Sequence, residues 1–382
     1  MQATRTTTYQ AAQNVAFTIE AHFARLLEAE MQLQTRDLAP EPPAAHIELI
    51  LDTAFWASLR REEGISPRIS LAYVPPEQVP QPLLLGQRFP LSAAILTKIA
   101  PGVERPGIHL GVWHEDGELY IWGTTSTIPG LCMVVDVSEP GLLVIKHRRA
   151  DGFGKFVNVA VLKGDQVKLV DEQAAHIPDC PSVLTSLLRF KSVNIQNNAY
   201  NILVQLAVSM RAHKRGGILL VVPAADEAWQ YSMVQPMAYT VQPAFTLLAH
   251  LLQKTEAEQD KVHVQEAIQR EVDMIAGLTA IDGATVISDK YELLAFGAKI
   301  GRLQGNDPVK EIVMTEPIVG GKAVRAHPSL KGGTRHLAAA QFVHDQRNAI
   351  ALVASQDGRF TVFSWSTCDE VVQAHRIDTL LL

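Results

Sequence analysis

Hydrophobic and polar residues follow a helical period near the start of the chain. Over residues 8–36, apolar side chains such as Ile19, Phe23 and Leu27 recur every three or four positions, with charged residues between them. This spacing predicts an amphipathic helix whose apolar stripe faces a core. Residues 39–45 contain three prolines and are interpreted as a linker or an extended entry to the next domain.

From residue 46 to about 185, short apolar runs alternate with turn residues, which predicts β-strands. The clearest pair covers residues 109–113 and 118–122, and the intervening Asp116-Gly117 is typical of a β-hairpin. We therefore predict a mainly β (α+β) domain with a few helices over residues 46–189. Further strands are expected at 131–137, 142–147, 156–162 and 166–170.

After Pro181 the pattern changes to alternating helices and strands. We predict a helix over 196–212, a basic and glycine-rich stop at 214–217, and a buried strand over 218–222. This alternation predicts an α/β C-terminal domain over 190–382, with a mixed sheet flanked by helices. Residues 1–45 are predicted to form a separate N-terminal helix and linker. Downstream, helical segments are expected at about 243–276 and 335–345, and strands at 284–288, 293–299, 349–355 and 359–365.

Composition and charge exclude several functional classes. With 47% hydrophobic and 19% charged residues, the chain resembles an ordinary packed globular protein. A formal charge of -6 argues against general nucleic-acid binding and against an anionic membrane surface as partner. The three cysteines form no CxxC pair, which argues against a zinc site or a disulfide framework. Because we find neither a signal-peptide pattern in residues 1–10 nor an apolar run long enough to span a membrane, we expect a cytoplasmic protein.

The first candidate motif is Asp282-Gly283-Ala284, at the start of a predicted strand. A carboxylate in this place can hold a divalent metal ion, which in turn can hold a triphosphate. Gly283 lets the backbone approach a ligand closely, and Ala284 keeps the neighbouring wall small, as a flat base requires. Taken alone, an Asp-Gly turn without a ligand explains the same residues and is the simpler interpretation.

The second candidate motif runs from Gly333 to His336, at the start of a predicted helix. A helix that begins near Thr334 points free backbone N–H groups at an anion, and the Thr334 hydroxyl is a candidate cap. Arg335 offers a forked donor for phosphate oxygens, and His336 can donate to a phosphate or stabilise a leaving pyrophosphate. Taken alone, a capped helix with a solvated Arg-His pair is the favoured interpretation.

Together, in this order and each beside a strand, the two motifs resemble the signature motifs of the diadenylate cyclase domain family. The resemblance covers residues 190 to about 368. It also includes the helix and strand at 196–221, the strand 294–300, which resembles one that lines the adenine pocket, and residues 353–356, which resemble a strand ending near the phosphates.

This resemblance implies an enzyme that condenses two ATP into cyclic di-AMP with release of pyrophosphate, using Mg²⁺ or Mn²⁺. Each subunit would hold one ATP, so two subunits of a homo-oligomer would meet face to face. Carried over by motif, Asp282 would bind the metal and activate the 3′-hydroxyl, while Arg335 and His336 would act on the phosphates. The residues implied to contact the nucleotide are Gly283, Ala284, Ile300, Gly333, Thr334, Leu337, Ala338 and Gln356.

Position 337 departs from the family pattern, because Leu337 follows His336 where the family commonly has a second arginine. A charged phosphate contact contributes about 1.5–3 kcal/mol. Lys322, Arg325 and Lys331 are the candidate substitutes. The alternative is therefore a catalytically weak or inactive nucleotide-binding signalling protein of the same fold, and another dinucleotide product stays open.

The β-rich domain at 46–189 resembles the probable sensor domains that are joined to some cyclases of this family. We expect it to bind an unknown small molecule or protein and to control how two cyclase faces meet. One catalytic half-site per chain makes dimer geometry a natural switch.

Overall fold

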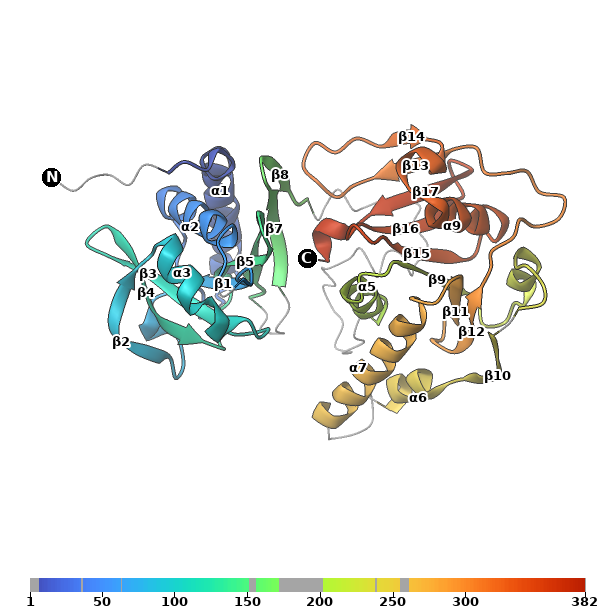
Figure 1. Ribbon diagram of the computed structural model, residues 1–382, viewed down its shortest axis with the longest axis horizontal. Helices are drawn as coiled ribbons and strands as arrows, with labels where there is room; N and C mark the ends of the chain where they lie inside the picture. The colour runs from blue at the N-terminus through green and yellow to red at the C-terminus, as the bar shows by residue number, and fades with distance from the viewer. Residues whose placement is uncertain are drawn as a thin grey trace. The chain divides into compact units, whose positions relative to one another are not determined.

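The computed structural model describes residues 7–35, 37–62, 64–150, 156–171, 202–237, 239–254 and 261–381. Two compact units divide the chain, Met1–Val170 (unit 1) and Asp171–Leu381 (unit 2), and each holds one mixed sheet with flanking helices (Figure 1). The predicted domain boundary at residue 189 lies outside the described residues and stays a prediction.

Unit 1 contains an 8-stranded sheet in the order β2-β4-β3-β1-β5-β6-β7-β8, in which only β1 and β3 run parallel. Its helices are α1 (Gln10–Gln32), α2 (Ala44–Ser58), α3 (Ala93–Ile99) and the short η1 (Pro76–Gln78) and η2 (Ala100–Val103). Its strands are β1 (Ile69–Tyr73), β2 (Leu83–Pro90), β3 (His109–Glu115), β4 (Glu118–Thr125), β5 (Met133–Glu139), β6 (Leu142–Arg148), β7 (Phe156–Lys163) and β8 (Gln166–Leu169).

The helix predicted over residues 8–36 is confirmed as α1, with somewhat shorter bounds. Ile19 and Phe23 of its apolar stripe are fully buried in the same core as Leu51 of α2 and Leu71 of β1. The helix that the sequence analysis set apart therefore belongs to the core of unit 1. The predicted hairpin is also confirmed, because β3 and β4 pair around Asp116-Gly117, whose φ angles of 51° and 83° suit a type I′ turn.

Unit 2 contains a 9-stranded sheet in the order β10-β12-β11-β9-β15-β16-β17-β13-β14. Its helices are α5 (Ile202–Ala212), α6 (Leu247–Lys254), α7 (Lys261–Leu278), α8 (Pro328–Lys331), α9 (Thr334–Asp345) and the short η3 (Ala228–Ser232) and η4 (Asp378–Leu380). Its strands are β9 (Gly217–Val222), β10 (Tyr239–Phe245), β11 (Ala284–Ser288), β12 (Leu293–Ala298), β13 (Ile312–Thr315), β14 (Val324–Ala326), β15 (Ile350–Ala354), β16 (Phe360–Ser366) and β17 (Val371–Arg376).

Both faces of the unit 2 sheet are covered, which explains the uninterrupted apolar run of β9. Leu219 lies in a core with Leu206 of α5 and Val272 of α7. Its neighbour Leu220 points to the other face and lies in a core with Phe342 of α9 and Phe363 of β16. Helices α5, α6 and α7 thus contribute to the core on one face, and α9 covers the other.

The predicted strands and helices of unit 2 are confirmed where they lie in the described residues, with one correction. Residues 243–245, expected to begin a helix, belong to strand β10 instead. β10 is the first strand of the sheet and pairs only with β12 among the described strands, so Pro243 occupies an edge position where a missing N–H is tolerated. The β-branched Thr240 and Val241 favour the same assignment.

Burial of His375 in β17 makes the stability of unit 2 dependent on pH. Its side chain is 2% exposed and its Nδ1 lies 2.7 Å from the Thr315 hydroxyl oxygen. Burial lowers the pKa of His375 to about 4. As the pH falls, His375 is therefore protonated in the unfolded chain before it is protonated in the folded one. The contribution of neutral His375 to the stability of the fold is complete above a pH of about 6.5 and is lost as the pH falls toward 4.

We expect the stability around β17 to fall by about 2 kcal/mol between pH 7 and pH 5 because of this one group. The measurement is hydrogen exchange of β16 and β17 peptides in the full chain. The variant His375→Gln should lose this part of the pH dependence, whereas His263→Gln on an exposed part of α7 should retain it. An unchanged pH dependence in His375→Gln would contradict the assignment.

Candidate functional site

Strand register places the Asp282-Gly283-Ala284 motif at one edge of the unit 2 sheet. Ala284, the first residue of β11, pairs with Ile218 at the start of β9 and with Ala298 at the end of β12. Gly217 of β9 pairs with Ala354 at the end of β15. Residues just before β9 and β11, and residues just after β12 and β15, therefore share this edge. We call it the motif edge.

Asp282 and Gly283 lie at the motif edge, immediately before β11. The Asp282 side chain is exposed, and the ion pairs found among the described residues do not include it. Gly283 has a φ of 112°, and a Cβ atom there would lie 2.4 Å from the carbonyl carbon of Gly297 in β12. Only glycine fits this close approach of the β12 backbone, and the predicted approach of Gly283 to a ligand stays a prediction.

Arg335 reaches the motif edge from α9. Gly216 has a φ of 71°, and a Cβ atom there would lie 2.9 Å from Nη1 of Arg335 and 3.1 Å from the Ala354 carbonyl oxygen. Gln356 Nε2 donates to the Arg215 carbonyl oxygen at 3.4 Å. Arg335, Gln356 and the turn before β9 therefore meet beside the strand that follows Asp282, and neighbouring strands lie about 4.8 Å apart.

The start of α9 corrects one detail of the second motif. The helix begins at Thr334 and Gly333 occupies the N-cap position, so the expected capping by the Thr334 hydroxyl is wrong. A residue inside the first turn has helical backbone angles, whereas a cap requires an extended residue before it. The amides of His336 and Leu337 donate to the Gly333 carbonyl, and both Thr334 and Arg335 are exposed.

His336 lies beneath the start of α9 and not on the exposed surface. Its side chain is 7% exposed, its Nε2 lies 3.3 Å from the Thr361 hydroxyl oxygen, and its ring meets Phe363 edge-on. Burial is the main cause that lowers the pKa of His336, and Arg359 adds to the effect. A neutral, buried imidazole supports the helix against β16, so the predicted contact of His336 with phosphate stays a prediction.

Leu337, Ala338 and Ile300 are partly buried and pack against the same apolar core under α9. Leu337 thus serves packing where the family commonly has an arginine. Among the candidate substitutes, Arg325 pairs with Glu311 at 2.8 Å beside β14, Lys322 is exposed, and the side chain of Lys331 lies outside the described residues. The Arg335 guanidinium lies against Gly216, and the residue before Gly216 is the basic Arg215.

An aromatic pair beside the motif edge was missed by the sequence analysis. Tyr239 of β10 and Phe296 of β12 stack with ring centroids 5.0 Å apart and planes 3° from parallel. Tyr239 is 50% exposed, and a Cβ atom on Gly297 would lie 2.9 Å from its ring. The sequence predicts no element for residue 239, because the helical segment is expected to begin only at about residue 243. A ring of this kind offers a flat surface for a base.

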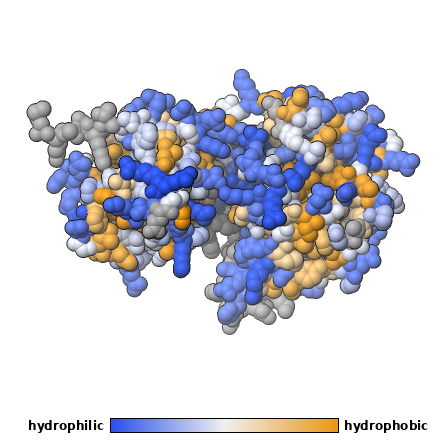
Figure 2. Space-filling model, in the orientation of Figure 1, coloured by the Kyte–Doolittle hydropathy of each residue, from blue (hydrophilic) through white to orange (hydrophobic). Residues whose placement is uncertain are grey.

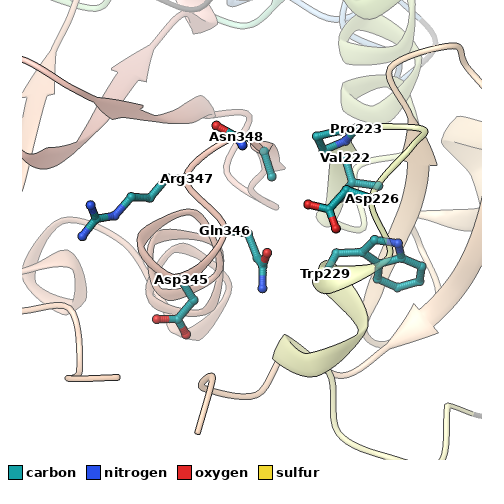
Figure 3. Close-up of a pocket in the computed structure, with 9 residues that line it drawn as sticks. Val222, Pro223, Asp226, Trp229, Asp345, Gln346, Arg347 and Asn348 are labelled. Carbon is teal, nitrogen blue, oxygen red and sulfur yellow. The ribbon is translucent and has the colours of Figure 1, made fainter. Parts of the chain in front are cut away.

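A separate cavity of about 240 Å³ lies at the opposite end of β9 (Figure 3). Figure 3 shows the Arg347 side chain turned away from it. The Asp345 carboxylate beside it already accepts hydrogen bonds from the Leu303 amide and from Asn306. This cavity contains none of the predicted site residues. Its lining residues are Val222, Pro223, Asp226, Trp229, Asp345, Gln346, Arg347, Asn348 and Ala349.

The described residues contain no group of three or more His, Cys, Asp or Glu side chains suited to a metal ion. A metal at the motif edge would therefore depend on the Asp282 carboxylate together with groups of the nucleotide. In the part of the chain that the structure describes, no helix combines the length and apolar character needed to cross a membrane.

Residues 36–126 match the family model described as "Probable sensor domain DACNV". The matched segment lies wholly within unit 1 and includes α2, α3 and strands β1 to β4. The expectation of an N-terminal sensor domain is thus supported for this segment. No curated protein matches the chain.

Proposed function

We propose that the motif edge of unit 2 binds ATP and that two such edges condense two ATP into cyclic di-AMP. One observation carries the proposal. Two motifs far apart in sequence supply an exposed carboxylate, Asp282, just before β11, and an exposed guanidinium, Arg335 of α9, which lies against Gly216 just before the neighbouring strand β9.

The chemistry is a double nucleotidyl transfer. The 3′-hydroxyl oxygen of one ATP attacks the α-phosphorus of the other, forming a P–O bond, while the bond between the α-phosphorus and its bridging oxygen breaks. Pyrophosphate leaves, and the hydroxyl proton passes to a base or to solvent. The second transfer closes the ring in the same way. Such reactions depend mainly on positioning and on neutralising charge.

Asp282 would hold the metal, because Mg²⁺ is usually bound through one or two carboxylates together with substrate phosphates. The exposed carboxylate of Asp282 fits this role. The bound metal would supply charge neutralisation and make the 3′-hydroxyl more acidic. Arg335 would donate its forked N–H groups to phosphate oxygens. Gly283 and the half-exposed ring of Tyr239 would offer a small residue and a flat surface to the adenine base. Ala284 is 1% exposed, so its contact with the nucleotide stays a prediction.

A face-to-face homodimer is part of the proposal, because each chain supplies one ATP site. Several exposed apolar residues support it: Tyr231, Val234, Tyr239 and Ile281 are between 38% and 75% exposed. Figure 2 shows apolar residues gathered on the side of unit 2 that carries β10, β11 and β12. A surface of this character is suited to contact with a second copy.

We also propose that unit 1 acts as the sensor and regulates how two motif edges meet. The similarity of residues 36–126 to a probable sensor domain supports this role. The test compares the full chain with a fragment of residues 190–382, which contains both apolar cores that the described residues form in unit 2. Regulation predicts different specific activities; equal activities over a wide range of protein concentration would contradict it.

The second candidate is a nucleotide-binding signalling protein without turnover, and the packing role of Leu337 favours it. The deciding experiment incubates the full chain with ATP and either Mg²⁺ or Mn²⁺ and identifies the products by mass spectrometry. Cyclic di-AMP supports the proposed function. ATP binding without a dinucleotide in either metal favours the second candidate, and absence of ATP binding contradicts both.

Arg335→Ala is expected to lower kcat/KM for ATP by about 10- to 100-fold, because a charge-assisted phosphate contact contributes about 1.5–3 kcal/mol. The matched control is Arg325→Ala, since Arg325 is half-exposed and pairs with Glu311 beside β14, away from the motif edge. Turnover assays on both variants provide the comparison. Equal losses in the two variants would show that Arg335 has no special role.

A further inference from the structure

We infer that His213 and Thr279 are positioning residues for the proposed reaction. Their hydrogen bond ties the turn that carries Arg215 and Gly216 to the turn that carries Asp282. The inference rests on the proposed function, and it adds two residues that lie outside both motifs.

That turn is short and its backbone is constrained. α5 ends at Ala212, Lys214 has a φ of 55°, and Gly216 has a φ of 71° before β9 begins at Gly217. The Arg215 amide donates to Nδ1 of His213 at 3.1 Å. The His213 ring therefore fixes the backbone of the turn at Arg215, and the Arg335 guanidinium lies against the same turn at Gly216.

The hydrogen bonds fix the tautomer of His213. A backbone N–H can only donate, so Nδ1 of His213 carries no proton and the proton is on Nε2. Nε2 lies 3.1 Å from the Thr279 hydroxyl oxygen and donates to it. The Thr279 hydroxyl in turn donates to the Ala276 carbonyl at 2.6 Å. In this series of three hydrogen bonds, from the Arg215 amide to the Ala276 carbonyl, each donor has one acceptor.

Burial and the neighbouring Arg215 guanidinium lower the pKa of His213, and this supports the neutral ring that the hydrogen bonds require. Thr279 is 1% exposed and lies at the end of α7, three residues before Asp282. A Cβ atom on Gly217 would lie 2.3 Å from the Thr279 carbonyl oxygen. The turn before β9 and the turn after α7 are thus in direct contact, and the His213–Thr279 hydrogen bond fixes their positions relative to each other.

The consequence for the reaction is geometric. One turn positions the carboxylate proposed to hold the metal, and the other positions the surface on which the phosphate-binding guanidinium rests. A change in their separation would move the Asp282 carboxylate relative to the Arg335 guanidinium without removing either group. Misplacement of reacting groups by about 1 Å can lower a rate by about 100-fold.

The test uses the full-length protein and Thr279→Val, which keeps the shape of the side chain and removes the hydroxyl. We expect kcat for ATP to fall by about 10- to 100-fold with KM changed by about twofold or less. Thr279→Ser retains a hydroxyl and should restore kcat. His213→Ala should lower kcat to a similar extent, and the double variant should be no worse than either single one, because both changes remove the same contact.

His263→Ala, on an exposed part of α7, is the matched control and should keep the wild-type kcat. Thermal unfolding identifies a temperature at which all variants are folded, and kcat is compared there. A wild-type kcat in Thr279→Val, no rescue by Thr279→Ser, or additive losses in the double variant would each overturn the inference alone. A wild-type protein that forms no dinucleotide with either metal overturns the proposed function and this inference together.

Discussion

Asp282→Asn is expected to lower dinucleotide synthesis by about 1,000-fold or more, the largest effect of any substitution at the motif edge. The carboxylate is the proposed protein ligand of the metal, and metal-based charge stabilisation contributes several kcal/mol to such a transition state, where each 1.4 kcal/mol corresponds to about tenfold in rate. Asparagine has nearly the same shape but no charge. Because Asp282 is exposed, the stability of the fold should change by less than about 0.5 kcal/mol.

The measurement is product formation by mass spectrometry, with thermal unfolding of the same samples. Asp289→Asn is the matched control, because Asp289 lies at the other end of β11 and its Oδ1 accepts the Ala224 amide, which asparagine can also do. This control should keep activity within about twofold of the wild type. Full activity in Asp282→Asn would remove the basis for metal binding at this residue.

Gly283→Ala is expected to destabilise unit 2 by about 2–4 kcal/mol, the largest stability effect at the site. The φ of 112° is strained for any residue with a Cβ atom, and the added atom would meet the backbone of β12 at Gly297. Backbone cannot move aside as a flexible side chain does, so β11 and β12 must separate. Hydrogen exchange of peptides from these two strands in the full chain measures the loss directly.

Gly277→Ala provides the control for this prediction. Gly277 lies in α7 and a Cβ atom there would contact nothing within 4 Å, so alanine should stabilise the helix by about 0.5–1 kcal/mol. The same exchange experiment on both variants separates a site-specific effect from a general cost of replacing glycine. A loss below about 0.5 kcal/mol in Gly283→Ala would contradict the close approach of β12.

The elements that the sequence predicted best are those whose local pattern is also their structural pattern. The period of α1 matches its buried stripe, and Asp116-Gly117 supplies the two positive φ angles that its hairpin needs. The uninterrupted apolar run of β9 reflects burial on both faces of the sheet. At 243–245, by contrast, pairing with β12 decided the structure, and no local signal reports which strand lies at an edge.

The candidate site divides in the same way. Asp282, Gly283 and Arg335 stand out in sequence because of their chemistry. Strand register places the first two at the motif edge, and the Arg335 side chain reaches this edge from α9. Tyr239 and the His213–Thr279 contact could not be predicted, because each depends on which strands and turns lie side by side. The burial of His336 also depends on tertiary packing, here of α9 on β16.

The most direct test of the proposed function is the stoichiometry of the reaction. The full-length protein is incubated with ATP as the sole nucleotide and Mn²⁺ or Mg²⁺, and cyclic di-AMP and pyrophosphate are quantified over time beside Asp282→Asn. Condensation of two ATP predicts two pyrophosphates for every cyclic di-AMP, with neither product in the variant. Bound ATP that stays intact in both metals, or pyrophosphate released without a cyclic dinucleotide, would contradict the account.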